Sequence, residues 1–217
     1  MTPIRPGSIG IMGGTFDPIH VGHLAIAEEA RDALGLERIL FVPAGQPAHK
    51  PVGAVTAAAH RVAMVELAIA DNRAFTLSRL EVDREGPSYT ADTVSEIRRT
   101  EEEAGRAPDL TLVLSVETFR ELPGWRAPER LLAAVRLAVV PREGYPAPDP
   151  GWLNEHFPGL EDRVDFLEGP RLGLSSTALR ERVARDRSIR YLVPVDVARY
   201  IHDHRLYRAH PTGDASP

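Results

Sequence analysis

The stretch of sequence that decides the fold runs Gly13-Gly14-Thr15-Phe16-Asp17-Pro18-Ile19-His20-Val21-Gly22-His23. It follows a short apolar run at residues 9–12, which is typical of a buried parallel strand. The glycine pair predicts a turn in which backbone amides approach a ligand closely, since a Cβ there would collide with it. Asp17-Pro18 predicts a second turn, and a helix that ends near Gly35 follows. A strand, a glycine turn and a helix in this order predict a phosphate site.

His20 and His23 are expected on the same side of the first turn of this helix, where free N–H groups and the helix dipole favour an anion. Two imidazole donors would complete a phosphate cradle. A structural turn with two histidines and a zinc pair are the alternatives. The chain has no cysteine, and its other histidines form no ligand cluster in the sequence, so we expect no protein-bound metal.

The composition is typical of an intracellular enzyme, with 217 residues, of which 43% are hydrophobic and 26% charged. No apolar run is long enough to cross a membrane, and no signal-peptide pattern opens the chain, so we expect a cytoplasmic protein without membrane partners. The net charge of −5 argues against nucleic acid as a partner. Zero cysteines exclude disulfides and thiol catalysis.

Strand and helix patterns alternate along the chain. Strands are expected at residues 9–12, 38–42, 75–78, 110–114, 135–140 and 164–167, and helices at 56–70, 88–103, 176–185 and 195–204. The apolar positions of the first of these helices are Val62, Val65, Leu67 and Ile69. The alternation predicts an α/β fold with a parallel sheet covered by helices on both faces, and with ligands at the carboxyl ends of the strands. We expect one domain over residues 1–207 and a disordered tail over 208–217.

A second polar cluster lies near the end of the domain, in Leu174-Ser175-Ser176-Thr177-Ala178-Leu179-Arg180. Hydroxyls at a helix start cap free amides and can also donate to phosphate. Arg180 falls on the same helical face as Thr177 and could grip a polyphosphate. Taken alone, the cluster is an ordinary helix cap beside an exposed arginine.

The two clusters together resemble the GGxFDPxHxGH and ISSTxxR motifs of the HxGH nucleotidyltransferase superfamily, which has a Rossmann-like fold. Members transfer a nucleotidyl group onto a phosphate. The resemblance implies a single Rossmann-like domain and an ATP site made of Gly13, Gly14, Thr15, Phe16, His20, His23, Ser175, Ser176, Thr177 and Arg180.

The middle of the chain resembles the bacterial nicotinate-nucleotide adenylyltransferases of this superfamily. Residues 86–93 match their GPSYTxDT segment, in which amides at a helix start receive the pyridine carboxylate, and residues 122–125 match LxxW, whose indole stacks on the pyridine ring. Residues 188–207 match their closing SIRYLVPxxVxxYIxxxxLY pattern. The resemblance implies a nicotinate mononucleotide site at Ser88, Tyr89, Thr90 and Trp125, although Trp125 alone could be a core residue.

One departure stands at Ser115-Val116-Glu117, where the family usually has Gly-Ala-Asp beside the substrate. Either Glu117 substitutes for the aspartate with a longer reach, or the pocket has changed. We assign Glu117 to the nicotinate mononucleotide site.

Lys50 is the only lysine among 26 lysine and arginine residues, and it lies in a loop that resembles the PxGxPxHK segment of one branch of the family. It is either a phosphate ligand or a solvated surface residue. The resemblance implies adenylyl transfer from ATP to nicotinate mononucleotide with Mg²⁺ carried by ATP, and His20, His23, Lys50 and Arg180 as the catalytic residues. Asp17 is expected to shape the turn.

Two alternatives remain open from the sequence. One is another HxGH enzyme, such as a pantetheine-phosphate adenylyltransferase or a cytidylyltransferase. The other is a non-catalytic nucleotide sensor, suggested by the departure at residues 115–117. The sequence also leaves open whether the protein forms a homo-oligomer.

Overall fold

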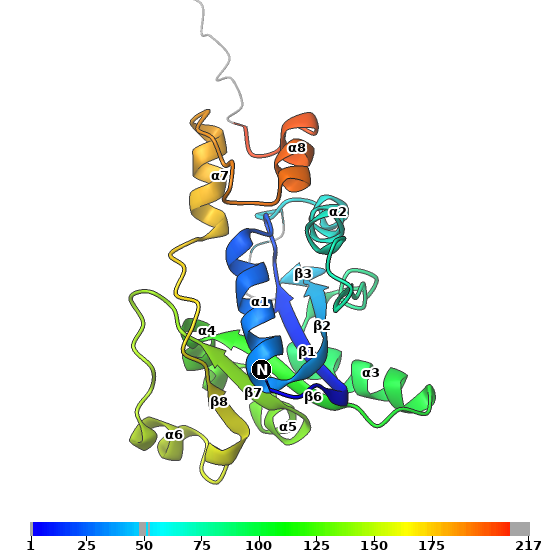
Figure 1. The fold of residues 1–217 in the computed structure, drawn as a ribbon, viewed down its shortest axis with the longest axis vertical. Helices are drawn as coiled ribbons and strands as arrows, with labels where there is room; N and C mark the ends of the chain where they lie inside the picture. Colours follow the sequence, from blue (N-terminus) through cyan, green and yellow to red (C-terminus); the bar gives the residue numbers. More distant parts are fainter. Residues whose placement is uncertain (1, 48–50, 52, 209–217) are drawn as a thin grey trace, which may run out of the picture.

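The computed structural model describes residues 2–47, 51 and 53–208. Its central sheet has six parallel strands, β1 (Arg5–Gly14), β2 (Leu36–Pro43), β4 (Phe75–Leu77), β6 (Asp109–Ser115), β7 (Arg136–Val140) and β8 (Val164–Phe166). Their order is β4-β2-β1-β6-β7-β8, so the chain winds outward from β1 to one edge and then returns to the other side of β1 (Figure 1). This order confirms the Rossmann-like α/β fold, whose ligands bind where the winding reverses, between β1 and β6.

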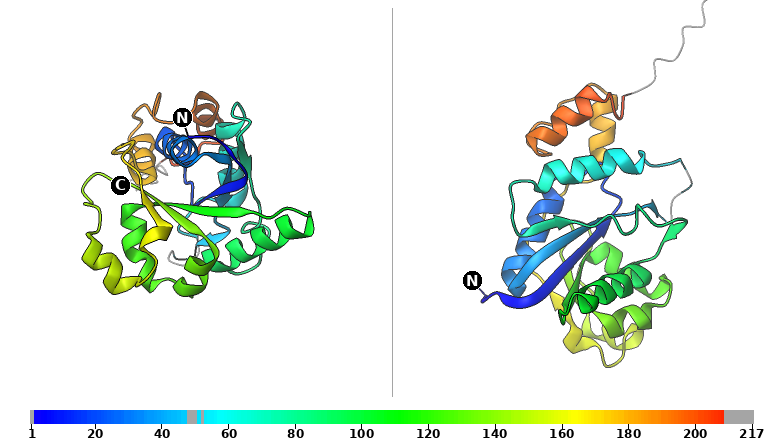
Figure 2. Two further views of the ribbon diagram at one scale, coloured as in Figure 1. Left: turned by 60° about the horizontal axis from the view of Figure 1, so that its bottom comes forward. Right: turned by 90° about the vertical axis from the view of Figure 1, so that its right-hand side faces the viewer.

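Helices cover both faces of the sheet. On one face lie α1 (Val21–Leu34) and α2 (Ala58–Ile69), and on the other lie α3 (Thr90–Glu103), α4 (Val116–Glu121), α5 (Pro128–Ala134) and α6 (Pro150–His156). Successive side chains of β6 point to opposite faces of the sheet. Leu112 belongs to the buried cluster that includes α3, and Val113 belongs to the cluster that includes Ala30 of α1. In the right-hand view of Figure 2, α2 lies above the sheet and α3 below it.

The last quarter of the chain returns to the α2 side of the sheet. Helices α7 (Ser176–Ala184) and α8 (Val195–Asp203) lie next to each other beyond the end of β1 (Figure 1). Leu179, Val197 and Ile201 join Met64 and Val65 of α2 in one buried cluster. Short 3₁₀ turns, η1 (Leu122–Gly124) and η2 (Glu161–Arg163), and a two-stranded sheet, β3 (Gln46–Pro47) with β5 (Pro87–Ser88), complete the described elements.

Helix α1 begins after His20 and ends at Gly35, whose left-handed conformation (φ 62°) satisfies the last turn as predicted. Its fully buried residues are Gly22, Ala27 and Ala30. Ala30 packs with Val113 of β6 and Ala138 of β7, where its small side chain allows the helix to lie close to the sheet.

Helix α2 departs from its predicted pattern at two positions. Leu67 is exposed, and Arg61 is 1% exposed and is the largest of the fully buried side chains. Most of the predicted tail, residues 209–217, lies outside the described residues. Among the helices that the structure describes, none has both the length and the apolar character needed to span a bilayer.

Candidate active site

A cavity of about 580 Å³ opens where β1 and β6 end. Its wall combines the two regions that the sequence assigns to different substrates, namely the glycine turn and the start of α3. Trp125 completes it on the side of η1. The lining residues are Gly13, Gly14, Thr15, Ala44, Pro47, Glu81, Ser88, Tyr89, Thr90, Ala91, Leu112, Leu114, Thr118, Glu121, Gly124, Trp125 and Arg126.

The glycine turn presents bare backbone to this cavity. Among the described residues, no atom would lie within 4 Å of a Cβ on Gly13, so these residues leave that side of the glycine open. A Cβ on Gly14 would lie 3.1 Å from the ring of Phe16. Phe16 itself is 2% exposed, so it can serve a phosphate site only through its backbone.

His20 and His23 stack against each other at the start of α1. Their ring centroids are 3.7 Å apart with an interplanar angle of 21°. The His20 backbone amide donates to Nδ1 of His23 at 3.2 Å, which in the neutral ring leaves the proton on Nε2. Nδ1 of His20 is buried and has no hydrogen-bond partner among the described residues. The arrangement offers a donor at Nε2 of His23.

Burial keeps both rings neutral. It lowers the pKa of His20 to about 4, and the positive charge of Arg142 adds to this effect. Burial, His20 and Arg142 together hold the pKa of His23 well below its usual range. Arg142 follows β7, so the carboxyl end of a third strand brings a charge toward the histidines.

Gly22, between the two histidines, lies close against the His20 ring. A Cβ at this position would lie 3.0 Å from Nδ1 of His20 and 3.1 Å from Cε1. Any larger residue would therefore press on the His20 ring and shift the stacked pair. A glycine at this position thus leaves the stacked rings in place.

The second polar cluster is bonded directly to the turn before α1. Ser176 Oγ donates to the Pro18 carbonyl at 2.9 Å, and Arg180 Nη1 donates to the Asp17 carbonyl at 2.8 Å. Ser175 caps α7 by accepting from the Ala178 amide at 3.2 Å. The structure therefore brings together the two regions that resemble the family's phosphate motifs, and their contact with ATP stays a prediction.

Thr177 belongs to the same cluster, because its hydroxyl accepts from Arg180 Nη2 at 3.2 Å. The first amide of α1, that of Val21, donates to the Leu192 carbonyl at 3.1 Å. That donor is consequently not free for an anion, contrary to what a bare helix start would offer.

Asp17 shapes the turn, as expected. Its carboxylate accepts from the Tyr207 hydroxyl at 2.7 Å and from the Thr56 amide at 3.1 Å, and the side chain is almost fully buried. Behind the turn, the guanidinium of Arg61 donates to the carbonyls of Thr15, Gly45 and Thr56 at 2.8 to 3.0 Å. These bonds fix the loop after β2 against the glycine turn.

On the acceptor side, Tyr89 is the N-cap residue of α3, so Thr90 and Ala91 begin the helix at the cavity wall. Ser88 Oγ accepts from the Gly45 amide at 3.2 Å and links the helix start to the loop after β2. Trp125 lines the cavity and also packs against the core beneath it, so both roles considered for it are compatible.

Glu117 is not among the residues that line the cavity. Its Oε2 lies 2.9 Å from Nε of Arg142, and its Oε1 accepts from the Tyr145 hydroxyl at 3.0 Å. Ser115, the first residue of the departure, caps α4 by accepting from the Thr118 amide at 3.2 Å. The assignment of Glu117 to the acceptor site stays a prediction, and its observed partner is Arg142.

Lys50 lies outside the described residues. Sequence reasoning missed Arg142, Arg126 and Arg61. The signal for Arg142 was available, because it follows a predicted strand at the edge where ligands bind. Arg126 directly follows the tryptophan of the acceptor motif. The burial of Arg61 had no signal in the sequence, because its three acceptors are backbone carbonyls.

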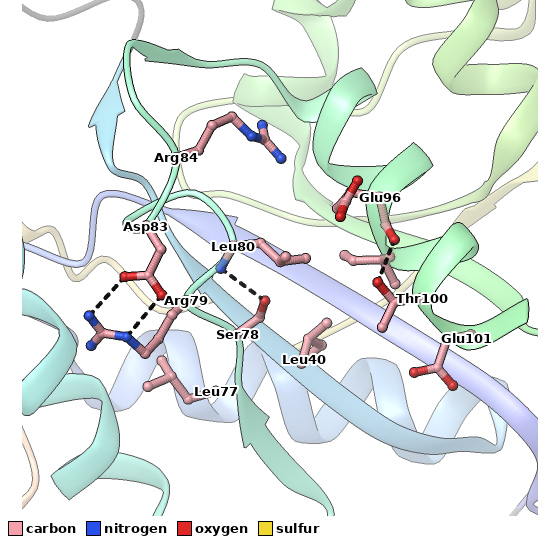
Figure 3. A pocket seen from close by; sticks show the side chains of 11 residues that line it. Leu40, Leu77, Ser78, Arg79, Leu80, Asp83, Arg84, Glu96, Thr100 and Glu101 are labelled. Atoms are coloured by element: carbon pink, nitrogen blue, oxygen red, sulfur yellow. Dashed lines mark hydrogen bonds and ion pairs between the residues drawn. The ribbon is translucent and has the colours of Figure 1, made fainter. Parts of the chain in front are cut away.

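A second cavity, about 770 Å³, opens beside β4 between residues 77–84 and α3 (Figure 3). Leu40, Leu77, Leu80 and Ile97 form its apolar part. Its charged residues have partners within the protein, as in the ion pair of Arg79 with Asp83 at 2.9 Å. This cavity shares no lining residue with the first one and carries none of the predicted site residues. Within the described ranges, no three acidic or histidine side chains gather as metal ligands.

Comparisons with known proteins agree with this geometry. A family model described as cytidylyltransferase-like matches residues 11–182, which include both phosphate motifs. A probable nicotinate-nucleotide adenylyltransferase of Roseiflexus sp. (strain RS-1) is 48% identical over 92% of this chain and 98% of that protein. One from Moorella thermoacetica is 42% identical over 94% and 93%. The chain belongs to the cytidylyltransferase-like family, among the nicotinate-nucleotide adenylyltransferases.

Solved structures of this adenylyltransferase family have the same fold. The Plasmodium falciparum nicotinic acid mononucleotide adenylyltransferase complexed with APC matches with a TM-score of 0.74 at 18% identity, covering 93% of this chain and 97% of that one. The same enzyme complexed with NaAD also matches with a TM-score of 0.74, at 17% identity. At this identity the likeness establishes the fold.

Proposed function

We propose that the protein transfers the adenylyl group of ATP to nicotinate mononucleotide, giving nicotinate adenine dinucleotide and pyrophosphate. Its relatives carry the name of this activity. The observation that carries the proposal is the single cavity in which the glycine turn faces Tyr89, Thr90 and Trp125. An ATP phosphate on the turn and a pyridine ring against the indole would then share one enclosed space.

The reaction needs alignment more than a nucleophilic side chain. An oxygen of the acceptor's 5′-phosphate forms a bond to the α-phosphorus of ATP, and the bond from that phosphorus to the oxygen bridging to the β-phosphate breaks. Pyrophosphate leaves with the electron pair. With a second pKa of about 6, the acceptor phosphate is largely ionised at neutral pH. The protein must therefore bring two anions together and offset their repulsion.

His23 is the proposed donor to the α-phosphate. Its neutral ring keeps a proton on Nε2, and that donor is held in place by the His20 amide on the opposite nitrogen. A fixed donor stabilises charge that develops in the transition state without reorganisation. We place the remaining ATP phosphates on the amides of Gly13 and Gly14 and on Arg180, with Lys50 as a predicted further ligand.

Arg142 adds a positive charge on the same side of the site. Its positive charge lowers the pKa values of both histidines, and in this proposal the same charge also acts on the bound phosphates. Because Glu117 holds Arg142, the carboxylate would act on the phosphates through the guanidinium. This gives Glu117 a positioning role in the proposal.

The start of α3 is the proposed site of the acceptor's carboxylate. The amides of Thr90 and Ala91 begin a helix of 14 residues at the cavity wall, where the helix dipole favours an anion. The indole of Trp125 would stack on the pyridine ring. Ser88, bonded to Gly45, fixes the helix start relative to the ATP side of the cavity.

Mg²⁺ belongs to the proposal as a companion of ATP. The described residues contain no cluster of acidic or histidine side chains that would hold it independently, whereas phosphate oxygens are its usual ligands. When bound, it would neutralise charge on the phosphates. A cytoplasmic location and the lack of nucleic-acid and membrane partners also stay predictions, and a homo-oligomer stays an open alternative.

A coupled pyrophosphate assay tests the function. We expect release of pyrophosphate from ATP with nicotinate mononucleotide, and appearance of nicotinate adenine dinucleotide in equal amount. Nicotinamide mononucleotide and phosphopantetheine serve as competing acceptors. A faster reaction with phosphopantetheine would assign another transferase activity. Binding of ATP and nicotinate mononucleotide without pyrophosphate release would indicate a sensor.

A further inference from the structure

Arg126 lies at the wall of the first cavity, directly after Trp125, and its side chain is exposed. The guanidinium carbon is 4.4 Å from the centroid of the Tyr89 ring, so the arginine is held against the face of that ring. A planar guanidinium on an aromatic face is a favourable arrangement that leaves its N–H groups free to donate sideways.

The neighbouring arginines are used differently. Arg120 donates to the Pro146 carbonyl at 3.0 Å, and Arg130 donates to the Ser95 hydroxyl at 2.8 Å and lies 3.4 Å from Asp92. Within the part of the chain that the structure describes, Arg126 has no carboxylate partner, and its contact is the ring of Tyr89. Its charge is therefore available to a ligand in the cavity.

The charged residues of the cavity wall indicate a role for Arg126 in binding an anion. Arg126 is the one cationic side chain among the described lining residues, and the acidic ones are Glu81 and Glu121. Glu81 is nearly buried and accepts from the Thr93 hydroxyl at 2.7 Å, while burial raises its pKa. Without Arg126, the described side chains of the wall would disfavour a negatively charged ring substituent.

The contact with the Tyr89 ring also fixes the position of the Arg126 charge. Tyr89 is the residue that caps α3, and the amides of Thr90 and Ala91 follow at the cavity wall. The guanidinium and the positive end of the helix dipole therefore lie on the same part of the wall. Two independent sources of positive potential at one place favour a full negative charge over a neutral amide.

We propose that Arg126 determines specificity in the proposed reaction by binding the pyridine carboxylate, which favours nicotinate mononucleotide over nicotinamide mononucleotide. This inference rests on the proposed function. The two acceptors have the same sugar and phosphate and differ in the ring substituent, so a contact with the carboxylate changes their ratio, whereas a contact with the phosphate does not.

The test measures kcat/KM for both acceptors in Arg126→Gln and Arg126→Lys. In Arg126→Gln we expect kcat/KM for nicotinate mononucleotide to fall about tenfold through KM, with the value for nicotinamide mononucleotide and the KM for ATP unchanged. Arg126→Lys should retain part of the preference, because it keeps the charge and loses the planar stack. Arg163→Gln is the control, since it removes the same charge from a half-buried arginine outside the cavity.

Each other outcome overturns the inference. An equal loss for both acceptors would place Arg126 on their shared phosphate or sugar, and an unchanged ratio would place it outside the site. An inactive wild-type protein would instead contradict the proposed function. Since Arg126 is exposed, we expect the variants to fold, and an unchanged melting temperature would confirm that only the site has been altered.

A second variant tests whether the Tyr89 ring holds Arg126 in place. Tyr89→Leu removes the ring face and should lower the acceptor ratio in the same direction as Arg126→Gln. Because the ring is proposed to act through the arginine, the double variant should lose no more of the ratio than Arg126→Gln alone. Additive losses would overturn the role of the ring in holding Arg126.

Discussion

Nε of Arg142 lies 2.9 Å from Oε2 of Glu117, and this ion pair joins the start of α4 to the loop after β7. The same loop is held a second time, because the Tyr145 hydroxyl donates to Oε1 of Glu117 at 3.0 Å. Glu117 stands at the position where the family usually has aspartate, and its longer side chain reaches this loop. The departure in sequence thus coincides with a specific contact.

Glu117→Gln should reduce kcat without unfolding the protein, because the amide cannot hold Arg142 by charge. Glu117→Asp should also lose activity, since its carboxylate falls short by about one methylene. Steady-state kinetics of both variants, beside Arg142→Gln and the double variant Glu117→Gln/Arg142→Gln, measure this. If Glu117 acts through Arg142, the double variant resembles Arg142→Gln alone. Full activity in Glu117→Gln would remove Glu117 from the site.

His23→Ala should lower kcat about a hundredfold, equivalent to roughly 3 kcal/mol of transition-state stabilisation, with little change in acceptor KM. The reason is that the Nε2 donor strengthens its contact as charge develops on the α-phosphate. His202→Ala, which alters an exposed histidine of α8, is the control. Near-normal turnover in His23→Ala would exclude His23 from the mechanism.

Trp125→Ala should raise KM for nicotinate mononucleotide moderately and leave KM for ATP unchanged, because an aromatic stack contributes roughly 0.5 to 1.5 kcal/mol beyond area burial. The other tryptophan of the chain, Trp152, supplies a matched control. It packs on Phe119 with ring centroids 5.4 Å apart and does not line the cavity. Trp152→Ala should lower the melting temperature alone. Equal losses for both substrates in Trp125→Ala would reduce its role to packing.

Stability should fall between pH 6.5 and about 4 because of His20. The folded protein keeps this ring neutral down to a pKa of about 4, whereas the unfolded chain binds the proton near 6.5. The contribution is therefore complete above pH 6.5 and is lost as the pH falls, by about 3 kcal/mol. Urea unfolding at several pH values, compared with His20→Gln, isolates the effect. Parallel pH profiles for the two proteins would contradict it.

The long periodic elements could be predicted from the sequence, and so could the three-residue edge strands Phe75–Leu77 and Val164–Phe166, but the short helices could not. The strand expected at 110–114 is observed at Asp109–Ser115, and the helix expected at 195–204 is observed at Val195–Asp203. Helices α4, α5 and α6 have six or seven residues each, which is fewer than two full turns in every case and gives no measurable period. They nevertheless carry Glu117 and border Trp125.

The phosphate motifs were recognisable because their chemistry is local, as with two histidines on one helical turn. The arginines were harder to assign. In the sequence Arg142 follows a predicted strand and Arg126 follows Trp125, but only the fold shows the partners of the three arginines. Arg61 donates to three carbonyls, Arg126 lies on the ring of Tyr89 and Arg142 pairs with Glu117. The function of each guanidinium depends on partners that are distant in the chain. The hydrophobic periodicity of the sequence does not predict those partners.

The bonds from Ser176 to Pro18, from Arg180 to Asp17 and from Tyr207 to Asp17 join residues 158, 163 and 190 positions apart. During synthesis the turn therefore leaves the ribosome long before the residues that hold it. A truncated or still growing chain has the glycine pair and the histidines but lacks the three hydrogen bonds that hold the turn. Competence to bind ATP should thus be acquired only after Tyr207 has been synthesised, so that shorter nascent chains do not sequester the nucleotide.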